Sequence, residues 1–395
     1  MFSRRPAAKS TSGPARPRVV LQSYSWGEIC CRIASGLADH ADVLLILSTE
    51  QAEPYQHLLD ERVELVTVAL PRLRQPVAQF RAQMQAFKAI RRFNPDVVHV
   101  QHGHFWFNMV MPLLRRYGYP LVISIHDPRH HLGDKSSQRS PQWMFDFGFR
   151  KADVIIAHTP AMRDVIIDEI GISPDQIEVV PLPAVGDPSL APAVSEESNS
   201  VLWFGRIWKY KGLDLLIDAQ PEINRRVPEA RFVIAGRGED FAQYRQAMVD
   251  PERFDVHNHF ISETELAALF SQASVVVLPY REATQSAVVV LAYTFGKPVV
   301  ATNVGGLADQ VDHGVTGLLV PPDDRQALAD AVAKLLVDDE LRTKMGQAGK
   351  EKLDKEWSPE AIATSIMKVY DKAASMIDGH AVGSATAAAE NSSAS

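Results

Sequence analysis

Short apolar runs and helical patterns alternate along most of this chain, and the clearest example begins at residue 275. The continuous apolar run 275–278 is typical of a buried parallel strand. A polar turn follows at 281–286, and the apolar stretch 287–295 is too long for a strand and stops at Gly296, which suits a helix C-terminus. The next strand begins at Pro298. Strand, turn, helix and strand make a βαβ unit, which predicts a parallel sheet with ligand-binding loops at the carboxyl ends of its strands.

The same alternation extends through the chain and predicts two α/β domains. A chain of 395 residues is long for a single core, and chains of this length commonly divide. The stretch 179–200 is rich in Pro, Ser and Ala and breaks the periodicity, as an interdomain linker does. The predicted divisions are a disordered lead-in at 1–17, an N-terminal doubly wound domain at 18–185, a linker at 186–199, a C-terminal doubly wound domain at 200–357, a final helix at 358–377 and a disordered tail at 378–395.

The composition of the chain excludes several classes of protein. With 46% hydrophobic and 23% charged residues and a formal net charge of −7, the chain is typical of a soluble protein without a nucleic-acid surface. No apolar run approaches the roughly 20 residues that a membrane span needs, and no apolar segment follows the basic N-terminus as in a secretory signal. The two cysteines, Cys30 and Cys31, are adjacent and cannot join distant parts of a fold, which suits a reducing compartment. We therefore expect a cytoplasmic protein.

Three loops of the C-terminal domain should leave the same edge of its sheet, and they carry residues suited to an anionic ligand. These residues are Gly205, Arg206 and Lys211 on the first loop, Gly236 and Gly238 on the second, and Glu282, Thr284, Gln285 and Ser286 on the third. Two fixed cations facing the N–H groups of a helix start suit a diphosphate. Each feature alone has a plainer explanation, such as a solvated charge, a tight glycine turn, or an N-cap at Thr284 or Ser286.

Six histidines gather on two predicted strand ends of the N-terminal domain and the loops after them: His99, His102, His104, His126, His130 and His131. A metal site would explain such a group, but the H-x-x-x-H spacing of a metal-binding helix and any Cys or paired carboxylate are missing, so no metal is expected. His126 and Asp127 end a strand, at the edge where functional side chains gather. His126 is predicted to face a polar substrate; the alternative is a structural histidine held by its neighbours.

The predicted helix 76–92 combines apolar and basic side chains. Phe80, Met84 and Phe87 share one stripe, and basic residues such as Arg81 lie on other faces. Such a helix could rest on anionic lipid. The commoner arrangement packs the Phe and Met side chains onto the sheet.

Four stretches of the second domain stand out: FGRIWKYKGLDLLI, FVIAGRG, ELAALFSQASVVVLPY and GKPVVATNVGGLADQVDHGVTGLLVPPDD. With them the chain resembles the retaining glycosyltransferases of GT-B fold in group 1, also called family 4. The resemblance implies two Rossmann-like domains facing each other across a cleft, with the sugar donor on the second and the acceptor mainly on the first. It implies that the final helix crosses back onto the first domain. Arg206 and Lys211 would hold the donor diphosphate, and His126 would approach the donor sugar.

The chain departs from this family at two positions. Members usually carry two glutamates eight positions apart, the second of them five residues before the Gly of the G-K-P segment. Counting back from Gly296 places Leu291 and Ala283 there, with Glu282 one residue away. We expect a rebuilt loop at 282–286, with no obvious carboxylate for the donor ribose and Glu282 as the candidate contact to the sugar. The turn 23–28 also has a single Gly where relatives often have a pair, and it lacks the G-x-G-x-x-G of a dinucleotide site.

The implied reaction moves a hexose from a nucleoside-diphosphate sugar to a hydroxyl acceptor, with retention at the anomeric carbon and without a metal or other cofactor. The accompanying expectations are a saccharide or lipid-linked saccharide acceptor, a place in cell-surface polysaccharide or glycolipid assembly, and peripheral contact with the inner membrane. Double displacement needs two carboxylates about 5 Å apart. No such pair stands out, so the resemblance and the cations favour stabilisation of the leaving diphosphate. The alternatives are a nucleotide-sugar epimerase of the same fold and a non-catalytic nucleotide-sugar-binding subunit.

Overall fold

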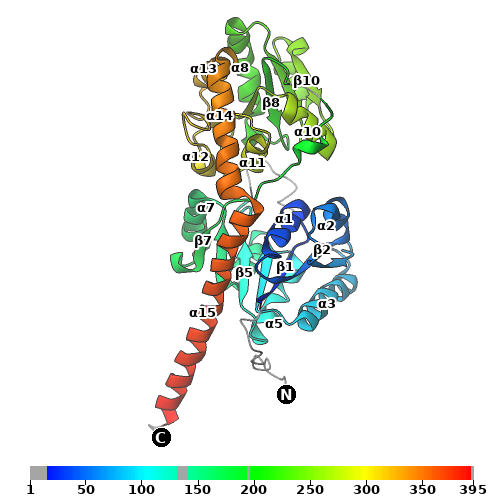
Figure 1. The fold of residues 1–395 in the computed structure, drawn as a ribbon, viewed down its shortest axis with the longest axis vertical. Coiled ribbons are helices and arrows are strands. Elements are labelled where there is room, and N and C mark those ends of the chain that lie inside the picture. The colour runs from blue at the N-terminus through cyan, green and yellow to red at the C-terminus, as the bar shows by residue number, and fades with distance from the viewer. Residues whose placement is uncertain (1–15, 131–140, 194–195, 393–395) are drawn as a thin grey trace.

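The chain folds into two parallel-sheet domains that follow each other along its longest axis (Figure 1). The structure is a computed structural model and describes residues 16–130, 141–193 and 196–392. Most of the predicted lead-in, and His131, lie outside these residues. Within them, no helix combines the length and the apolar character that crossing a membrane requires.

The N-terminal domain is built on a seven-stranded parallel sheet with the strand order β3-β2-β1-β4-β5-β6-β7. Its strands are β1 (Arg18–Gln22), β2 (Asp42–Ser48), β3 (Glu64–Val68), β4 (Val97–Gln101), β5 (Leu121–Ser124), β6 (Val154–Ala157) and β7 (Ile177–Val179). Its helices are α1 (Gly27–Leu37), α2 (Thr49–Ala52), α3 (Pro76–Phe93), α4 (Phe105–Asn108), α5 (Met111–Arg116), α6 (Gln142–Phe149) and α7 (Pro160–Val165). The strand order reverses between β1 and β4, where Gln22 pairs with Val100. The loops after these two strands therefore diverge and leave room for a ligand.

The C-terminal domain repeats this plan with six parallel strands in the order β10-β9-β8-β11-β12-β13. The strands are β8 (Ser200–Phe204), β9 (Arg231–Ala235), β10 (Phe254–His257), β11 (Val275–Leu278), β12 (Val299–Thr302) and β13 (Gly317–Val320). The helices are α8 (Leu213–Arg226), α9 (Ala242–Ala247), α10 (Glu263–Gln272), α11 (Ala287–Thr294), α12 (Gly305–Gln310), α13 (Arg325–Val337) and α14 (Asp339–Lys352). The order reverses between β8 and β11, so the loops that carry the predicted diphosphate residues flank this crevice.

The chain crosses between the domains twice, and the two crossings touch. The backbone N–H of Ala184 donates to the carbonyl of Trp357 at 2.7 Å. The last helix, α15 (Pro359–Ser392), then runs along the N-terminal domain (the red helix in Figure 1), where the hydroxyl of Tyr370 lies 2.9 Å from Nδ1 of His99. Both sheets are thereby held by one continuous C-terminal segment.

Helix α15 continues through 378–392, a stretch that the sequence predicts as a disordered tail. Low complexity suggested disorder, but the alanine-rich run 385–389 has high helix propensity and extends a helix that tertiary contacts have already nucleated. The remaining residues, 393–395, lie outside the described part of the chain.

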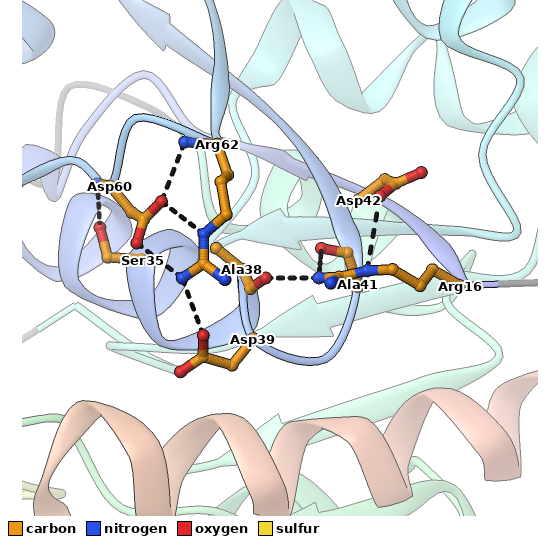
Figure 2. Close-up of polar contacts among 8 residues, drawn as sticks. All are labelled: Arg16, Ser35, Ala38, Asp39, Ala41, Asp42, Asp60 and Arg62. Carbon is orange, nitrogen blue, oxygen red and sulfur yellow. Dashed lines mark hydrogen bonds and ion pairs between the residues drawn. The ribbon is translucent and has the colours of Figure 1, made fainter.

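Helix α1 is fixed at its C-terminal end by two arginines (Figure 2). Arg16 donates from its guanidinium to the carbonyl of Ala38, the C-cap residue of α1, and to that of Ala41, just before β2, the latter at 3.0 Å. Arg62 donates to Oδ1 of Asp39, just beyond the end of α1, at 2.8 Å, and also binds Asp60, with Nε 2.8 Å from Oδ1. The opposite end of α1 begins at Gly27, after the carboxyl end of β1.

Helix α3 does not pack as the expected stripe. Phe87 is buried, whereas Phe80 is 62% exposed and Met84 is only partly covered. The face against the sheet is made instead of Gln79, Ala82, Gln83, Ala86, Phe87, Ile90 and Phe93. Buried glutamine explains the difference, since Gln83 accepts from the Tyr24 hydroxyl at 3.0 Å and hydropathy alone would have placed it outside.

Candidate active site

Two loops of the C-terminal domain, after β8 and after β9, pack directly against each other. A Cβ atom at Gly236 would lie 1.9 Å from the carbonyl oxygen of Gly205, and one at Gly238 would lie 2.0 Å from that of Ile207. Gly205 and Gly236 have φ angles of 131° and 139°, which glycine alone adopts readily. The sequence suggested that Gly236 and Gly238 let the backbone approach a ligand. In the structure they let one loop approach the other, and this contact fixes the position of Arg206.

Lys211 is a buried cation at the carboxyl edge of this sheet. Its exposed fraction is 9%, and its Nζ donates to the hydroxyl of Tyr280 at 2.7 Å. Burial lowers the pKa of Lys211, and the charge of Arg206 adds to the decrease, while Tyr210 and Asp127 act in the opposite direction. Lys211 and Arg206 therefore lie close enough to repel each other, which an anion between them would relieve.

The start of α11 is partly occupied by protein groups, which corrects the prediction of free N–H groups. Ser286 is the N-cap, and its Oγ accepts from the N–H of Val288 at 3.2 Å. Its own N–H donates to Oε1 of Gln310 at 2.7 Å. Ser286 therefore has the capping role that was the plainer of the two explanations.

The two residues before Ser286 bury polar atoms. Oγ1 of Thr284 and Oε1 of Gln285 have no hydrogen-bond partner among the described residues. The carbonyl of Thr284 accepts from the hydroxyl of Thr159, in the N-terminal domain, at 2.7 Å. A Cβ atom at Gly306 would lie 2.0 Å from the same carbonyl oxygen, so this glycine is needed for close packing. Buried polar atoms without partners are costly, and they mark a place for a polar ligand or water.

A cavity of about 330 Å³ lies between the domains beside this loop. The N-terminal domain contributes Arg129, His130, Val165 and Glu169 to its lining, and the C-terminal domain contributes Arg281, Glu282, Ala283, Thr284, Val304 and Gly305. Glu282, the predicted contact to the sugar, is exposed at this cavity. Arg281, which is also part of the lining, is bound by both oxygens of Asp214, each at 2.8 Å.

His126 is fully buried beyond the end of β5. Its Nε2 lies 2.9 Å from Oε1 of Gln101, an acceptor, so Nε2 carries the proton. Trp26 stacks on the ring at a centroid distance of 4.3 Å, and His158 lies at 4.6 Å. Burial lowers the pKa of His126 well below its usual range, and neighbouring His158 adds to the effect. His126 is a neutral imidazole whose Nδ1 has no partner in the described part of the chain.

His158 is likewise a buried imidazole with one bonded and one unbonded ring nitrogen. Its Nδ1 donates to the carbonyl of Val180 at 2.9 Å, and its Nε2 has no partner among the residues that the structure describes. Burial lowers the pKa of His158 to about 4. His126 and His158 are thus adjacent neutral imidazoles, and each has one ring nitrogen that can accept a hydrogen bond. Such acceptors suit the hydroxyl groups of a sugar.

The other predicted histidines have different places. His99 binds Tyr370 of α15 and is structural. His102 accepts from the backbone N–H of His126 at 3.2 Å through Nδ1. His130 lines the cavity between the domains. His99 and His102 are therefore bonded to other protein groups, and His130 faces the cavity.

Sequence reasoning gave no role to Trp26, Gln101, His158 or Tyr280. The signal that could have found three of them is position, since Gln101, His158 and Tyr280 follow or end strands at the carboxyl edges of the sheets. Trp26 also follows a strand, in the turn 23–28 after β1. It has a φ of 62°, an uncommon conformation for a bulky residue that is often kept at functional sites.

Leu291 and Ala283, which stand where relatives usually have glutamate, are both buried. Leu291 is 7% exposed, and a Cβ atom at Gly186 in the linker would lie 2.8 Å from its Cδ2. Ala283 is buried, and its carbonyl accepts from the N–H of Gly306 at 2.9 Å. The loop 282–286 is held by packing and by hydrogen bonds to Thr159, Gly306 and Gln310.

Comparison with known proteins places this chain in a family. Residues 198–338 match the model described as Glycosyl transferases group 1, and residues 28–184 match the one described as Glycosyltransferase Family 4. The D-inositol 3-phosphate glycosyltransferase of Kribbella flavida is 31% identical over 299 residues, which are 69% of this chain and 70% of that protein. The protein belongs to the group 1, family 4 glycosyltransferases.

This glycosyltransferase has further relatives of varied description. Glycogen synthase of Mycobacterium tuberculosis is 29% identical over 298 residues, 71% of this chain and 69% of that protein. Among solved structures, Anabaena HepE in complex with UDP-glucose has a TM-score of 0.68 at 17% identity, covering 90% of this chain and 100% of that one. The structural likeness confirms the predicted GT-B fold of two Rossmann-like domains.

Proposed function

We propose that this glycosyltransferase moves a hexose from a nucleoside-diphosphate sugar to a hydroxyl acceptor, with retention at the anomeric carbon. One observation carries the proposal. The buried ammonium of Lys211, with the charge of Arg206 beside it, faces the end of β5 across the cleft, close enough for Asp127 to act on the pKa of Lys211. Donor-side cations and sugar-side imidazoles therefore come from opposite domains.

Lys211 and Arg206 suit the donor diphosphate. Burying an ammonium is costly unless an anion compensates it, and a diphosphate supplies that anion where the two cations repel each other. These side chains can supply positive charge to the leaving group, so the proposal requires no metal or other cofactor at this step. The description of HepE in complex with UDP-glucose supports a nucleotide-sugar donor by likeness of fold.

The neutral imidazoles suit the hexose. Nδ1 of His126 and Nε2 of His158 can accept hydrogen bonds from sugar hydroxyls. Oγ1 of Thr284 and Oε1 of Gln285 can bind the same ligand from the other domain. Glu282 lines the adjoining cavity and can contact a sugar hydroxyl or the acceptor.

In the proposed step, the bond between the anomeric carbon and the donor phosphate oxygen breaks as the acceptor oxygen approaches from the same face. The acceptor proton passes to the leaving phosphate. Lys211 and Arg206 stabilise the negative charge that develops there. The contact between Thr159 and Thr284 joins the two domains at this loop, and a closed cleft would limit access of water to the sugar.

Helix α3 supports an acceptor at a membrane surface, such as a lipid-linked saccharide of polysaccharide or glycolipid assembly. Val77 is 66% exposed and Phe80 62% exposed. Arg81 and Lys88 line a shallow groove together with Phe80. The segment 65–95 contains six Arg and Lys residues and no Asp or Glu, in a chain whose net charge is −7. Exposed apolar side chains among cations fit peripheral contact with anionic lipid.

A panel of nucleotide sugars tests the proposal. Purified protein would be titrated calorimetrically with UDP, GDP and ADP, and the sugar of the preferred nucleotide would then be supplied with saccharide acceptors. We expect one nucleotide to bind best, and a product whose anomeric configuration by NMR equals that of the donor. An inverted product would contradict retention. A donor that binds but is never consumed would favour the non-catalytic alternative, to which Leu291 and Ala283 point.

A further inference from the structure

Three ligand-type side chains meet at the edge of the C-terminal sheet, away from the histidines that the sequence singled out. His257 ends β10, His259 lies in the following loop, and Glu265 is in the first turn of α10. One ligand atom from each lies within 4.8 Å of the others. No other group of His, Cys, Asp and Glu in the described residues meets this condition.

The two imidazoles converge on one carboxylate. Oε1 of Glu265 lies 3.0 Å from Nδ1 of His257 and 2.9 Å from Nε2 of His259, and its Oε2 lies 3.1 Å from the latter. The three side chains are 26%, 55% and 27% exposed, in the order His257, His259, Glu265, so an ion could enter from solvent.

Asp255 fixes the orientation of His257 from the other side. Its Oδ2 lies 3.0 Å from Nε2 of His257. An imidazole that donates its Nε2–H to a carboxylate keeps the lone pair on Nδ1, the nitrogen that faces Glu265. A metal-bound histidine usually donates the N–H of its second ring nitrogen to a carboxylate, which is the arrangement of Asp255 and His257.

We propose that His257, His259 and Glu265 bind one divalent transition-metal ion of the zinc type, with Asp255 orienting His257. Two imidazole nitrogens and one carboxylate are a common zinc donor set, with a water completing the tetrahedron. Bonds of about 2.0–2.1 Å place tetrahedral ligand atoms about 3.3 Å apart. The present N···O separations of 2.9–3.1 Å need to open by only a few tenths of an ångström.

The ion would act on the donor side as a positioning element. The carbonyl of His257 accepts from the N–H of Gly236 at 3.0 Å, so the cluster is joined to the loop that packs on Gly205. In the same loop as His259, the exposed ring of Phe260 lies 5.6 Å from the guanidinium of Arg237. A metal ion would fix this loop beside the cleft without touching the reacting atoms.

Metal binding can be measured directly on the full chain. Tag-free protein would be stripped with a chelator and dialysed against Zn²⁺, and its zinc content determined by mass spectrometry. We expect one equivalent in the wild type and at least tenfold weaker binding in the double variant His257→Ala/His259→Ala. Cobalt substitution should give the visible absorption of a tetrahedral Co²⁺ site. His40→Ala, which removes an exposed histidine of the N-terminal domain, is the matched control and should bind as the wild type does.

Two milder variants keep the proposal testable if the double variant fails to fold. Glu265→Gln preserves shape and removes the carboxylate charge, so it should weaken zinc binding at least tenfold. Asp255→Asn should weaken it by about tenfold, as loss of an orienting carboxylate commonly does. Zinc content that is equal in all variants would overturn the site. No zinc in the wild type would also overturn it, and would identify the cluster as an imidazolium held between two carboxylates.

Discussion

Nζ of Lys211 lies 2.7 Å from the hydroxyl of Tyr280, and this bond joins the β8 loop to the end of β11. The two residues stand on either side of the point where the strand order reverses. Burial raises the pKa of Tyr280, so the phenol stays protonated and can accept from the ammonium while donating elsewhere. Lys211 is thereby fixed at the crevice instead of extending into solvent.

Lys211→Ala should weaken binding of the preferred nucleoside diphosphate by about 1.5–3 kcal/mol, the usual size of a charged hydrogen bond. Isothermal titration calorimetry measures this directly. Lys209→Ala is the matched control, because Lys209 lies two residues away and is exposed. Tyr280→Phe should have a smaller effect in the same direction, since it frees the ammonium without removing its charge. Equal affinities in wild type and Lys211→Ala would refute the placement of the diphosphate.

Leu291→Glu should not restore donor binding, although it supplies the carboxylate that relatives carry. Leu291 is buried against Gly186 in the linker, and a buried carboxylate without a partner is strongly destabilising. We expect a fall of several degrees in Tm and unchanged nucleotide affinity. Leu291→Ala, which leaves a cavity, should cost about 2–4 kcal/mol of unfolding free energy and serves as comparison. Tighter nucleotide binding by Leu291→Glu would show that this position reaches the ribose.

Acidification should destabilise the protein through its buried histidines. Burial lowers the pKa of His99 to about 3 and that of His158 to about 4, whereas unfolded histidines titrate near 6.5. Between these values the unfolded chain binds more protons than the folded one, so the free energy of unfolding falls as the pH falls below 6.5. We expect a loss of about 1 kcal/mol per pH unit for each histidine, measured by urea unfolding from about pH 7 to 5.5.

The exposed His40 provides the control for this pH dependence. His40→Ala should leave the slope unchanged, while His158→Gln should reduce it. A slope that is insensitive to His158→Gln would mean that this ring is not buried in its neutral form.

Thr159→Ala should loosen the contact between the domains. The Thr159 hydroxyl donates to the carbonyl of Thr284 at 2.7 Å and accepts from the N–H of Met162 at 3.1 Å as an N-cap. Its loss should cost about 1 kcal/mol through the cap and speed hydrogen exchange in peptides that span 283–286. Thr159→Ser keeps the hydroxyl and should exchange as the wild type does. Identical exchange in Thr159→Ala would show that this hydrogen bond does not hold the loop 283–286 in place.

Binding to anionic vesicles should depend on α3. Arg81→Ala with Lys88→Ala should weaken co-sedimentation with phosphatidylserine vesicles by about 2 kcal/mol, since each cation near such a surface contributes about 1 kcal/mol. Phe80→Ser should weaken it further by removing an exposed ring. Val337→Ser, at an equally exposed apolar site of the C-terminal domain, should have no effect. Sedimentation that is insensitive to all three changes on α3 would remove the membrane contact from the proposal.

Local patterns determined the architecture. Short continuous Val, Ile and Leu runs such as 43–47 and 275–278 are typical of strands buried on both faces, and their alternation with helices favours parallel sheets. The short strand β10 was not predicted, because two of the four residues in Phe254–His257 are charged or polar and the strand lies at the edge of its sheet. The helix extension at 378–392 was not predicted either, because low complexity was taken for disorder.

The sequence predicted only those residues of the candidate site whose place follows from their position after a strand. Arg206, Lys211 and His126 follow strand ends, and parallel strands bring such ends to one edge whatever the rest of the chain does. The neutral state of His126 was not predictable, since it depends on burial beneath Trp26 and on the proton donated to Gln101. The packing of Gly236 and Gly238 was not predictable either, because the atoms they accommodate belong to a loop about 30 residues earlier in the chain. Their approach to a ligand stays a prediction.

The sequence by itself therefore determined the two sheets, their edges and the family, since these depend on periodicity and on spacings within a few tens of residues. Only the tertiary structure decided which polar atoms keep unsatisfied hydrogen-bonding capacity, where Leu291 packs, and that His257, His259 and Glu265 converge. The physical reason is that burial, pKa and ligand geometry depend on distances between side chains from separate elements. Those distances are set by the packing of the elements and by the contact of two domains, neither of which any local pattern encodes.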